Sequence, residues 1–410
     1  MTKLIERLQH QPLIEALKTR RVVLLTGARQ CGKTTLSKEL KILSSTYRTL
    51  DEETFRKSAL YDPEGFVVSD YQTMIIDEIQ RAPSLLIAIK KVVDEKNTYG
   101  QFLITGSANL SAMPSVHESL AGRIQKIRLR TLTQTEIASE KSDFLKMAFA
   151  QNFKAPVICE NKAAILEYCF RGGYPEVLTM TQRNRRSWHN DYMDALLSRD
   201  LQDIAKIHKF QAMGDLVKIL CAWTGKLLDM SALGSNLAIS RMTLEAYFNA
   251  LEILFVVERV SPWIKVDYQR VGRQPKLFLT DSGLICSLLR WQYDQVLLDS
   301  DRAGKIFETF IFNELAALVD ASLGEFALYH YRDREGREVD FIIEKDDGSV
   351  LGIEVKAGSS VGQGDFKHLL WLQKTIKHPF VGIVLYSGSH VLPFGKNLWA
   401  VPMASIWRST

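Results

Sequence analysis

The chain has 410 residues, of which 46% are hydrophobic and 24% are charged, and this balance excludes a disordered or fibrous protein. At about 100–200 residues per domain, a chain of this length is expected to fold as several domains. The five cysteines include no CxxC pair, which excludes a zinc ribbon and is typical of a reducing compartment. No apolar run approaches the ~18 residues that a membrane span needs, and the first residues lack a signal-peptide core. We therefore expect a cytoplasmic protein without a membrane partner.

The net charge of +5 is spread along the chain rather than gathered in one basic region. Lys+Arg against Asp+Glu is 20 to 16 in residues 1–140, 20 to 17 in residues 141–300 and 12 to 14 in residues 301–410. None of these regions has the strongly basic balance of a dedicated nucleic-acid-binding domain. Binding to nucleic acid would therefore depend on local patches.

Residues 1–140 alternate apolar runs with helical patterns. The runs are continuous and rich in Leu, Ile and Val, as expected of strands buried on both faces, and they cover residues 21–27, 73–79 and 101–107. Helical patterns lie between them at residues 33–43 and 83–96. This alternation predicts an α/β fold with a parallel sheet and helices on both sides.

The rest of the chain divides into a helical region and a second α/β region. Residues 141–300 carry apolar side chains at helical spacing, for example over 210–225 and 242–257. In residues 301–410, a helix near 305–319 precedes apolar strand patterns at 326–333, 338–344, 350–356 and 380–387. The prediction is an α/β protein with three domains, over residues 1–140, 141–300 and 301–410.

A glycine-rich loop directly follows the first predicted strand. The sequence from Gly27 to Thr34 is GARQCGKT, which matches G-x-x-x-x-G-K-[ST] between a strand and a helix. Backbone N–H groups of such a loop close around phosphates, the lysine reaches the β- and γ-phosphates, and the hydroxyl binds Mg²⁺. The sequence therefore predicts an ATP and Mg²⁺ site that comprises Gly27, Gln30, Cys31, Gly32, Lys33, Thr34 and Thr35. Arg29 is expected to be a solvated or packing side chain.

Two carboxylates end the second predicted strand. Asp77 is placed to hold Mg²⁺, and Glu78 is placed to polarise the water that attacks ATP. The third strand ends in polar residues, of which Asn109 or Ser107 could sense the γ-phosphate or merely cap the strand. Arg123 follows this strand and could neutralise transition-state charge in its own chain or in a neighbouring subunit, or form a surface salt bridge.

These motifs together carry a resemblance to a known family. The segments GARQCGKT, IIDEIQ, LITGSANL and SLAGR, with GGYPEV (172–177), SRDL (198–201) and LTDSGL (279–284) downstream, resemble a bacterial and archaeal branch of the AAA-type P-loop ATPases. The resemblance covers nearly the whole chain. It implies ATP binding and hydrolysis, and a C-terminal domain of unknown function, but it says little about biology.

The middle region contains a winged-helix-like pattern over residues 230–260. A helix, a tight turn, a second helix from Ser240 and a strand are expected in that order. A DNA-reading helix usually presents several basic or amide side chains, whereas residues 240–250 offer only Arg241 as a cation. The pattern therefore favours a rigid docking module over a DNA-contacting helix.

The C-terminal region places two carboxylates and a lysine on a predicted hairpin. Pairing the strands so that residue numbers sum to about 694 sets Asp340 opposite Glu354, with Lys356 on the same face as Glu354. Like charges in facing positions are unfavourable, so this arrangement requires a nearby cation. Two carboxylates on Mg²⁺ beside a lysine would suit phosphodiester hydrolysis.

This hairpin resembles the D…E-x-K site of restriction-endonuclease-like nucleases. The resemblance implies a further carboxylate from the preceding helix, for which Glu308 is the first choice and Glu314 the second. The expected metal ligands are then Thr34 and Asp77 at the loop, and Glu308, Asp340 and Glu354 at the C-terminal site. The alternative is a nuclease-fold relic or an exposed acidic hairpin without activity.

The functional hypothesis is an ATPase whose nucleotide state controls a nuclease-like C-terminal domain. Its expected catalytic residues are Lys33, Glu78 and Arg123 for ATP, and Asp340, Glu354 and Lys356 for cleavage. Two alternatives remain, a nucleotide switch whose C-terminal domain only binds a partner and a motor that remodels a polymer. ATP is the expected ligand, and nucleic acid and further copies of this chain are candidate partners.

Overall fold

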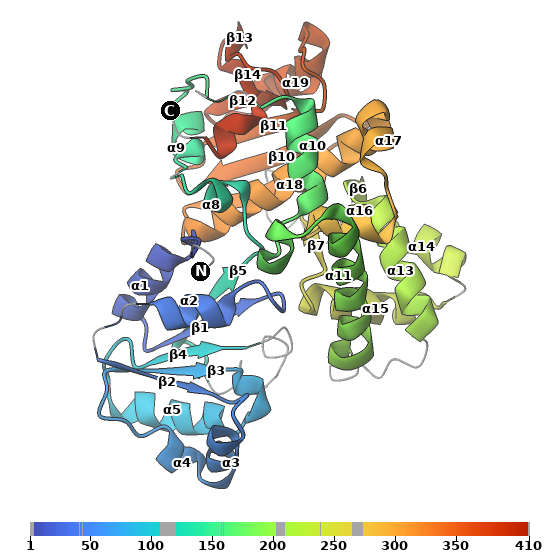
Figure 1. Ribbon diagram of the computed structural model, residues 1–410. Coiled ribbons are helices and arrows are strands. Elements are labelled where there is room, and N and C mark those ends of the chain that lie inside the picture. The colour runs from blue at the N-terminus through green and yellow to red at the C-terminus, as the bar shows by residue number, and fades with distance from the viewer. Residues whose placement is uncertain are drawn as a thin grey trace.

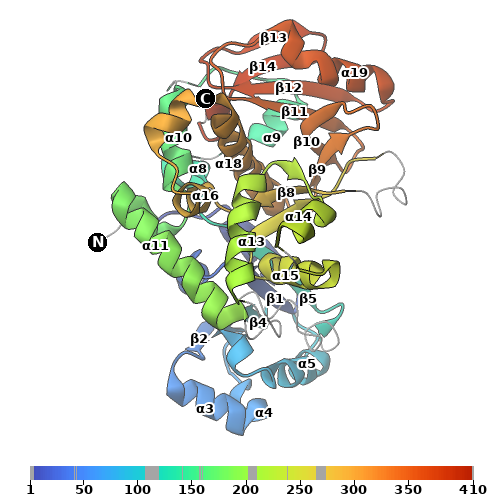
Figure 2. The same cartoon turned by 90° about the vertical axis from the view of Figure 1, so that its right-hand side faces the viewer.

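Figure 1 shows a computed structural model of the protein. It describes residues 4–40, 42, 44–106, 120–140, 142–156, 158, 160–201, 210–237, 239–264 and 274–408. Three sheets organise these residues, a parallel one of five strands, an antiparallel one of three and a mixed one of six. The five-stranded and six-stranded sheets lie at opposite ends of the molecule, with helices of the middle region between and beside them (Figures 1 and 2). The predicted α/β fold class is confirmed.

The N-terminal sheet has the order β2-β3-β4-β1-β5, and all of its strands are parallel. The strands are β1 (Val22–Gly27), β2 (Ser45–Thr49), β3 (Thr73–Asp77), β4 (Phe102–Thr105) and β5 (Ile124–Leu129). The helices around it are α1 (His10–Thr19), α2 (Lys33–Glu39), α3 (Glu53–Tyr61), α4 (Pro63–Phe66) and α5 (Leu85–Glu95).

Helices cover both faces of this sheet, as the continuous apolar runs predict. All six residues of β1 are buried, and alternate ones belong to different core clusters. Val23 and Leu25 pack with α1 and α2, whereas Val22 and Leu24 pack with α5. A parallel sheet covered on both faces needs apolar side chains at every position, which is why these strands do not alternate.

The middle region is mostly helical. Its helices are α10 (Lys162–Arg171), α11 (Gln182–Ala195), α13 (Phe210–Trp223), α14 (Met230–Leu237), α15 (Arg241–Ile253), α16 (Ser282–Leu288) and α17 (Tyr293–Leu298). A small antiparallel sheet of order β6-β8-β7 joins them, with β6 (Lys226–Leu227), β7 (Val257–Val260) and β8 (Lys276–Leu279). The expected order of helix, turn, helix from Ser240 and strand is confirmed by α14, α15 and β7, and the Ser240 side chain accepts the N–H of Thr243 as a helix cap.

The C-terminal region begins with the long helix α18 (Ser300–Ala321) and continues into a mixed sheet of order β13-β14-β12-β11-β10-β9. Its elements are β9 (Phe326–Arg332), β10 (Glu338–Lys345), β11 (Val350–Lys356), α19 (Lys367–Thr375), β12 (Phe380–Tyr386), β13 (Leu392–Gly395) and β14 (Leu398–Pro402). β9, β10 and β11 are antiparallel neighbours, whereas β11 and β12 are parallel. α18 and α19 pack on opposite faces of this sheet.

Residues just after the N-terminal sheet contact the C-terminal region as well as the middle region. The helices concerned are α8 (Gln134–Ala138) and α9 (Phe144–Phe149). The ring of Phe149 stacks on that of Phe326 in β9, with centroids 5.4 Å apart. The hydroxyl of Thr135 also donates to the carbonyl oxygen of Ile406, at 3.4 Å. The segment that follows the N-terminal sheet is therefore packed against the C-terminal region.

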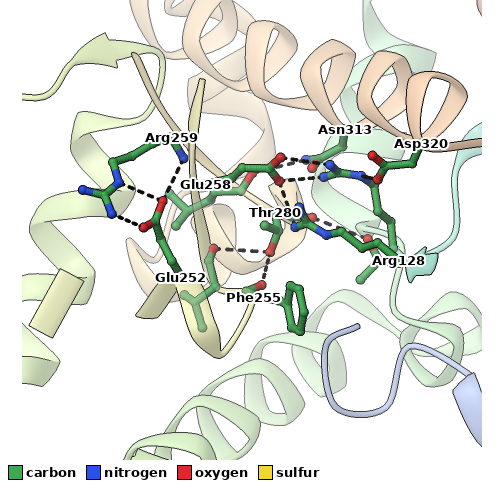
Figure 3. Close-up of polar contacts among 12 residues, drawn as sticks. Arg128, Glu252, Phe255, Glu258, Arg259, Thr280, Asn313 and Asp320 are labelled. Carbon is green, nitrogen blue, oxygen red and sulfur yellow. Dashed lines mark hydrogen bonds and ion pairs between the residues drawn. The ribbon is translucent and has the colours of Figure 1, made fainter. Parts of the chain in front are cut away.

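A cluster of charged side chains joins the three regions (Figure 3). Arg130, which follows β5, donates to both carboxylate oxygens of Glu258 on β7, at 2.8 and 3.0 Å, and to Asp320 on α18, at 2.6 Å. Arg128 on β5 contacts Glu258 as well, at 2.8 Å. Burial raises the pKa of Glu258, but the charges of Arg128 and Arg130 outweigh it and lower that pKa to about 2.

Candidate functional site

The phosphate-binding loop has the backbone that its glycines predict. A Cβ at Gly27 would lie 2.1 Å from the carbonyl oxygen of Leu129, so this position has room only for glycine. Gly32 has a φ of +104°, a left-handed conformation that other residues rarely adopt. The two glycines therefore let the chain leave β1, close a tight loop and enter α2 at Lys33.

Lys33 is placed to reach phosphates from inside the loop. Its side chain is buried, and its Nζ donates to the carbonyl oxygens of Gly27 at 3.0 Å and Ala28 at 2.8 Å. These contacts keep the ammonium of Lys33 over the loop without a bound anion. Phosphate oxygens are stronger acceptors for an ammonium than backbone carbonyls are, so a nucleotide can replace them.

Asp77 lies at the carboxyl end of β3 and accepts several hydrogen bonds. The hydroxyl of Thr34 donates to its Oδ2 at 2.9 Å, the hydroxyl of Tyr47 to the same oxygen at 2.7 Å, and Thr105 on β4 to its Oδ1. Burial and the neighbouring Asp77 raise the pKa of Tyr47 above its ordinary value. Thr34 and Asp77, which were predicted from separate motifs, are therefore direct neighbours.

The donor set at this loop fits Mg²⁺ bound together with a nucleotide. Hydroxyl and carboxylate oxygens are the ligands that Mg²⁺ prefers, and Thr34 and Asp77 supply one of each. In the part of the chain that the structure describes, no group of three or more His, Cys, Asp or Glu side chains could hold a metal ion. Mg²⁺ at this loop would therefore take further ligands from the phosphates of the nucleotide and from water.

Glu78 has a strained backbone next to this pair. Its φ of +60° is a conformation that a non-glycine residue adopts at a cost of about 1–3 kcal/mol. Its N–H donates to the hydroxyl of Thr105 at 3.2 Å, and the side-chain amide of Gln80 donates to its carboxylate. Such strain is often found at functional sites, which supports a specific role for this carboxylate.

Two side chains from outside the motif, Arg7 and Tyr192, hydrogen-bond to the backbone of the loop, and neither was predicted from the sequence. Arg7 donates to the carbonyl oxygen of Cys31 at 2.8 Å and pairs with Glu136 at 3.0 Å, and its side chain is buried. Tyr192 on α11 donates its hydroxyl to the carbonyl oxygen of Arg29 at 3.2 Å. No local signal marks Arg7. Tyr192 contacts Tyr174 of the GGYPEV segment with tilted rings, and the hydroxyl of Tyr174 donates to that of Tyr192 at 3.1 Å.

Arg123 does not reach this site within its own chain. It directly precedes β5, whose first residue Ile124 pairs with Val22, whereas the loop follows the other end of β1. The strand separates Arg123 from the loop by roughly 17–20 Å. Its guanidinium forms a two-pronged pair with Asp94 near the end of α5. Of the three alternatives for Arg123, the pair with Asp94 matches the surface salt bridge, and this placement does not support action in its own chain. A role in a neighbouring subunit stays a prediction. Asn109 and Ser107 lie outside the described residues.

The C-terminal hairpin has the predicted register. Phe341 faces Ile353 and Ile342 faces Gly352, so the residue numbers sum to 694. The N–H of Val355 donates to Asp340 Oδ2 at 2.9 Å, and Lys356 Nζ lies 3.4 Å from Glu354 Oε2. Burial, followed by the charge of Asp340, raises the pKa of Glu354 well above its ordinary value. The hairpin therefore brings two carboxylates and a lysine together.

A lysine from the middle region completes this cluster, and sequence reasoning missed it. Lys276 is the first residue of β8, and its Nζ lies 2.5 Å from Glu308 Oε1, 2.7 Å from Glu338 Oε1 and 3.4 Å from Asp340 Oδ1. Burial lowers the pKa of Lys276, but the three carboxylates outweigh burial and raise it above its ordinary value. The available signal was a single lysine at the start of the apolar strand KLFL.

The C-terminal carboxylates do not fit a divalent metal in this arrangement. The ammonium of Lys276 already contacts Glu308 and Asp340, two of the three predicted ligands. Burial raises the pKa of Glu308 to about 8, although the ammonium of Lys276 opposes this shift. The predicted metal site at Glu308, Asp340 and Glu354 is replaced here by an ion-pair cluster.

Comparison with known families agrees with the geometry of the loop. Residues 19–138 match the family described as an AAA domain. This stretch is therefore similar to AAA domains. Residues 162–295 and 303–406 each match a domain of unknown function (DUF8612 and DUF4143). The stretch that matches the AAA domain therefore holds the phosphate-binding loop, Asp77 and Glu78, while the residues of the C-terminal cluster fall within the two matches of unknown function.

Two relatives that match along most of this chain are described as uncharacterized proteins. Proteins of Mycobacterium tuberculosis and Mycobacterium bovis are 29% identical over 402 residues, which is 96% of this chain and 82% of theirs. Among solved structures, a Walker-type ATPase of Pyrococcus abyssi is 14% identical, with 68% of this chain and 94% of that one covered and a TM-score of 0.44. Across the described residues, no helix is both long and apolar enough to cross a bilayer.

Glu314, the second choice for the helix carboxylate, serves another contact. It is buried and accepts the N–H of Gln134, in the last helix of the AAA domain, at 2.7 Å. Burial raises its pKa to about 8, although this hydrogen bond opposes the shift. Glu314 therefore joins α18 to the AAA domain and takes no part in the C-terminal cluster.

We expect Glu314→Gln to flatten the pH dependence of stability. Because the folded-state pKa is raised above the unfolded one, the wild type loses stability as pH rises from about 4.5 to about 8. A glutamine keeps the hydrogen bond without titrating, so the variant should lose about 4 kcal/mol less than the wild type between pH 5 and pH 9. Urea unfolding at the two pH values measures this difference, and equal losses in both proteins would contradict the assignment.

Proposed function

We propose that this protein hydrolyses ATP at the loop between β1 and α2. The observation that carries the proposal is the convergence of Lys33, Thr34 and Asp77 at the carboxyl edge of the sheet, with Glu78 directly beside them. Each of these side chains has the chemical type that ATP hydrolysis requires at that position. The match of residues 19–138 to the AAA domain supports the same conclusion.

Each residue has a distinct part in this proposal. The ammonium of Lys33 exchanges its two backbone acceptors for phosphate oxygens and compensates their charge. Thr34 and Asp77 hold Mg²⁺, which supplies charge neutralisation to the phosphates when it is bound. Glu78 accepts a proton from the attacking water, and its fixed backbone and the amide of Gln80 orient the carboxylate.

We propose that a change in the loop on binding nucleotide is transmitted to the middle and C-terminal regions by the side chains that contact the loop and β5. Tyr192 contacts the backbone of Arg29 from α11, and Arg130 joins β5 to β7 and α18. A change in the loop on binding ATP would therefore act on side chains that also hold the middle and C-terminal regions. Self-association, with Arg123 acting on a neighbouring subunit, is part of the same proposal.

A second candidate function is nucleotide-controlled phosphodiester cleavage by the C-terminal region. The observation that favours it is the element order of α18, β9, β10, β11, α19 and β12, with an antiparallel hairpin followed by a parallel neighbour. This order accompanies Asp340, Glu354 and Lys356 on adjacent strands, as the restriction-endonuclease resemblance implies. We derive no metal-dependent step, because Lys276 contacts the carboxylates that such a step would use.

Phosphate release from ATP tests the main proposal. The wild type should turn over ATP with Mg²⁺ and stop when EDTA removes the metal, whereas Lys33→Ala should lose at least about tenfold in ATP affinity. Lys38→Ala, an exposed lysine on the same helix, is the matched control and should behave as the wild type. A wild type that binds ATP without any turnover would overturn hydrolysis and leave only a nucleotide switch.

A further inference from the structure

The C-terminal acidic cluster has an internal cation. Lys276 has only 1% of its surface exposed, and its ammonium lies within 3.4 Å of carboxylates from two separate elements, α18 and β10. A buried ammonium is stable only when carboxylates surround it, and buried carboxylates equally need a cation. The cluster and Lys276 therefore depend on each other.

The backbone around Lys276 fixes its position. β8 pairs with β7 and β6 in the small sheet, so its first residue cannot move without disturbing both neighbours. The residues that follow β7 also contact the C-terminal sheet, since the N–H of Trp263 donates to the carbonyl oxygen of His330 on β9 at 2.6 Å. Glycine at position 225 also lets the backbone before β6 lie close to the carboxylate of Glu308, because a Cβ there would lie 2.9 Å from Glu308 Oε2.

Lys276 contacts two of the three carboxylates that were predicted as metal ligands. Glu308 and Asp340 come from the helix and strand that the nuclease resemblance assigns to metal ligands, and Lys276 reaches both, with Glu338 added. Lys356 separately neutralises Glu354 from the same hairpin. Three cations, Lys276, Lys356 and Arg332, therefore lie against the carboxylates of this cluster.

We propose that the ammonium of Lys276 is the resident cation of the C-terminal acidic cluster and occupies the place of a divalent metal. The middle region thereby blocks this site, because a metal can bind Glu308 and Asp340 only if Lys276 no longer contacts them. This inference deepens the second candidate function and rests on its assignment of the acidic site, but it is independent of ATP hydrolysis. It explains why facing carboxylates are tolerated in the fold without a metal.

Binding of Mn²⁺ to the nucleotide-free protein tests the proposal. Electron paramagnetic resonance of free Mn²⁺ would compare the wild type, Asp340→Asn, Lys276→Met and the double variant Lys276→Met with Asp340→Asn. We expect the wild type and Asp340→Asn to bind equally little Mn²⁺. Lys276→Met should gain a site that the double variant lacks. Greater Mn²⁺ binding by the wild type than by Asp340→Asn would overturn the proposal.

Thermal unfolding gives a second readout that does not depend on activity. Lys276→Met leaves the carboxylates without their cation, so its melting temperature should fall by roughly 5–10 °C and largely recover with Mn²⁺. Lys226→Met, an exposed lysine on the same small sheet, is the matched control and should show neither effect. A folded Lys276→Met protein that gains no Mn²⁺ binding and no Mn²⁺-dependent stability would contradict the proposal.

Two further measurements test the proposal if Lys276→Met does not fold. Lys276→Arg keeps a cation in the cluster and is expected to fold without Mn²⁺ dependence, and the pair of wild type and Asp340→Asn still reports whether the native site binds metal. DNA cleavage with Mn²⁺ by the unaltered protein would show an open site and overturn closure by Lys276. Phosphate release measured on the same samples reports separately on the ATPase proposal.

Discussion

Replacing Glu78 with glutamine is expected to lower kcat for ATP hydrolysis by about 10²–10⁴-fold while ATP still binds. A glutamine has nearly the same shape and still contacts Gln80, but it cannot accept the proton of the attacking water. Lys33, Thr34 and Asp77, which contact the nucleotide or its metal in our proposal, are unchanged. Single-turnover phosphate release gives the chemical rate, and equilibrium binding of a fluorescent ATP analogue gives the affinity.

Glu39→Gln is the matched control for this experiment. Glu39 is an exposed glutamate at the end of α2 in the same domain, so its replacement changes the net charge equally without touching the site. A Glu78→Gln protein that keeps half of the wild-type rate would show that this carboxylate does not activate water. A protein that loses ATP binding as well would show instead that Glu78 maintains the loop.

Arg130→Met is expected to reduce the free energy of unfolding by about 3–5 kcal/mol. The guanidinium of Arg130 is largely buried and makes three hydrogen bonds to two carboxylates, which would lose their main partner. Glu258 would keep Arg128, but Asp320 would keep no contact to β5. The midpoint of urea unfolding, read by tryptophan fluorescence, measures the loss.

The control for this prediction is an exposed ion pair of the same type. Arg302 lies 3.3 Å from Asp299 at the start of α18, and both side chains are exposed, so Arg302→Met should cost less than about 1 kcal/mol. A double-mutant cycle with Glu258→Gln would isolate the pairwise energy between Arg130 and Glu258. If Arg130→Met were as stable as Arg302→Met, the cluster would not be what joins the three regions.

Arg123 lies at the amino end of a strand that was not among the strands predicted from the sequence. The segment IQKIRL after it has the apolar spacing of a strand, and it forms β5 parallel to β1. A residue before a parallel strand lies at the amino edge of the sheet, away from the phosphate-binding loop. The strand pattern alone could therefore have excluded a role for Arg123 in its own chain.

The sequence by itself determined the features that depend on neighbours in the chain. The glycines at 27 and 32 predicted the phosphate-binding loop, because only glycine fits its backbone. The short turn between two adjacent strands predicted the register of the C-terminal hairpin, because it leaves few pairings, and period-two alternation predicted which side chains share a face. These features need no knowledge of the rest of the fold.

Only the tertiary structure decided which side chains complete the two sites. Tyr47 and Thr105 reach Asp77 from neighbouring strands, and Lys276 reaches Asp340 across 64 positions of sequence. The sequence shows that facing carboxylates require a cation, but the strength of such a contact depends on distance and burial rather than on spacing along the chain. The choice between a metal ion and an internal lysine was therefore made by the packing of β8 against α18 and β10.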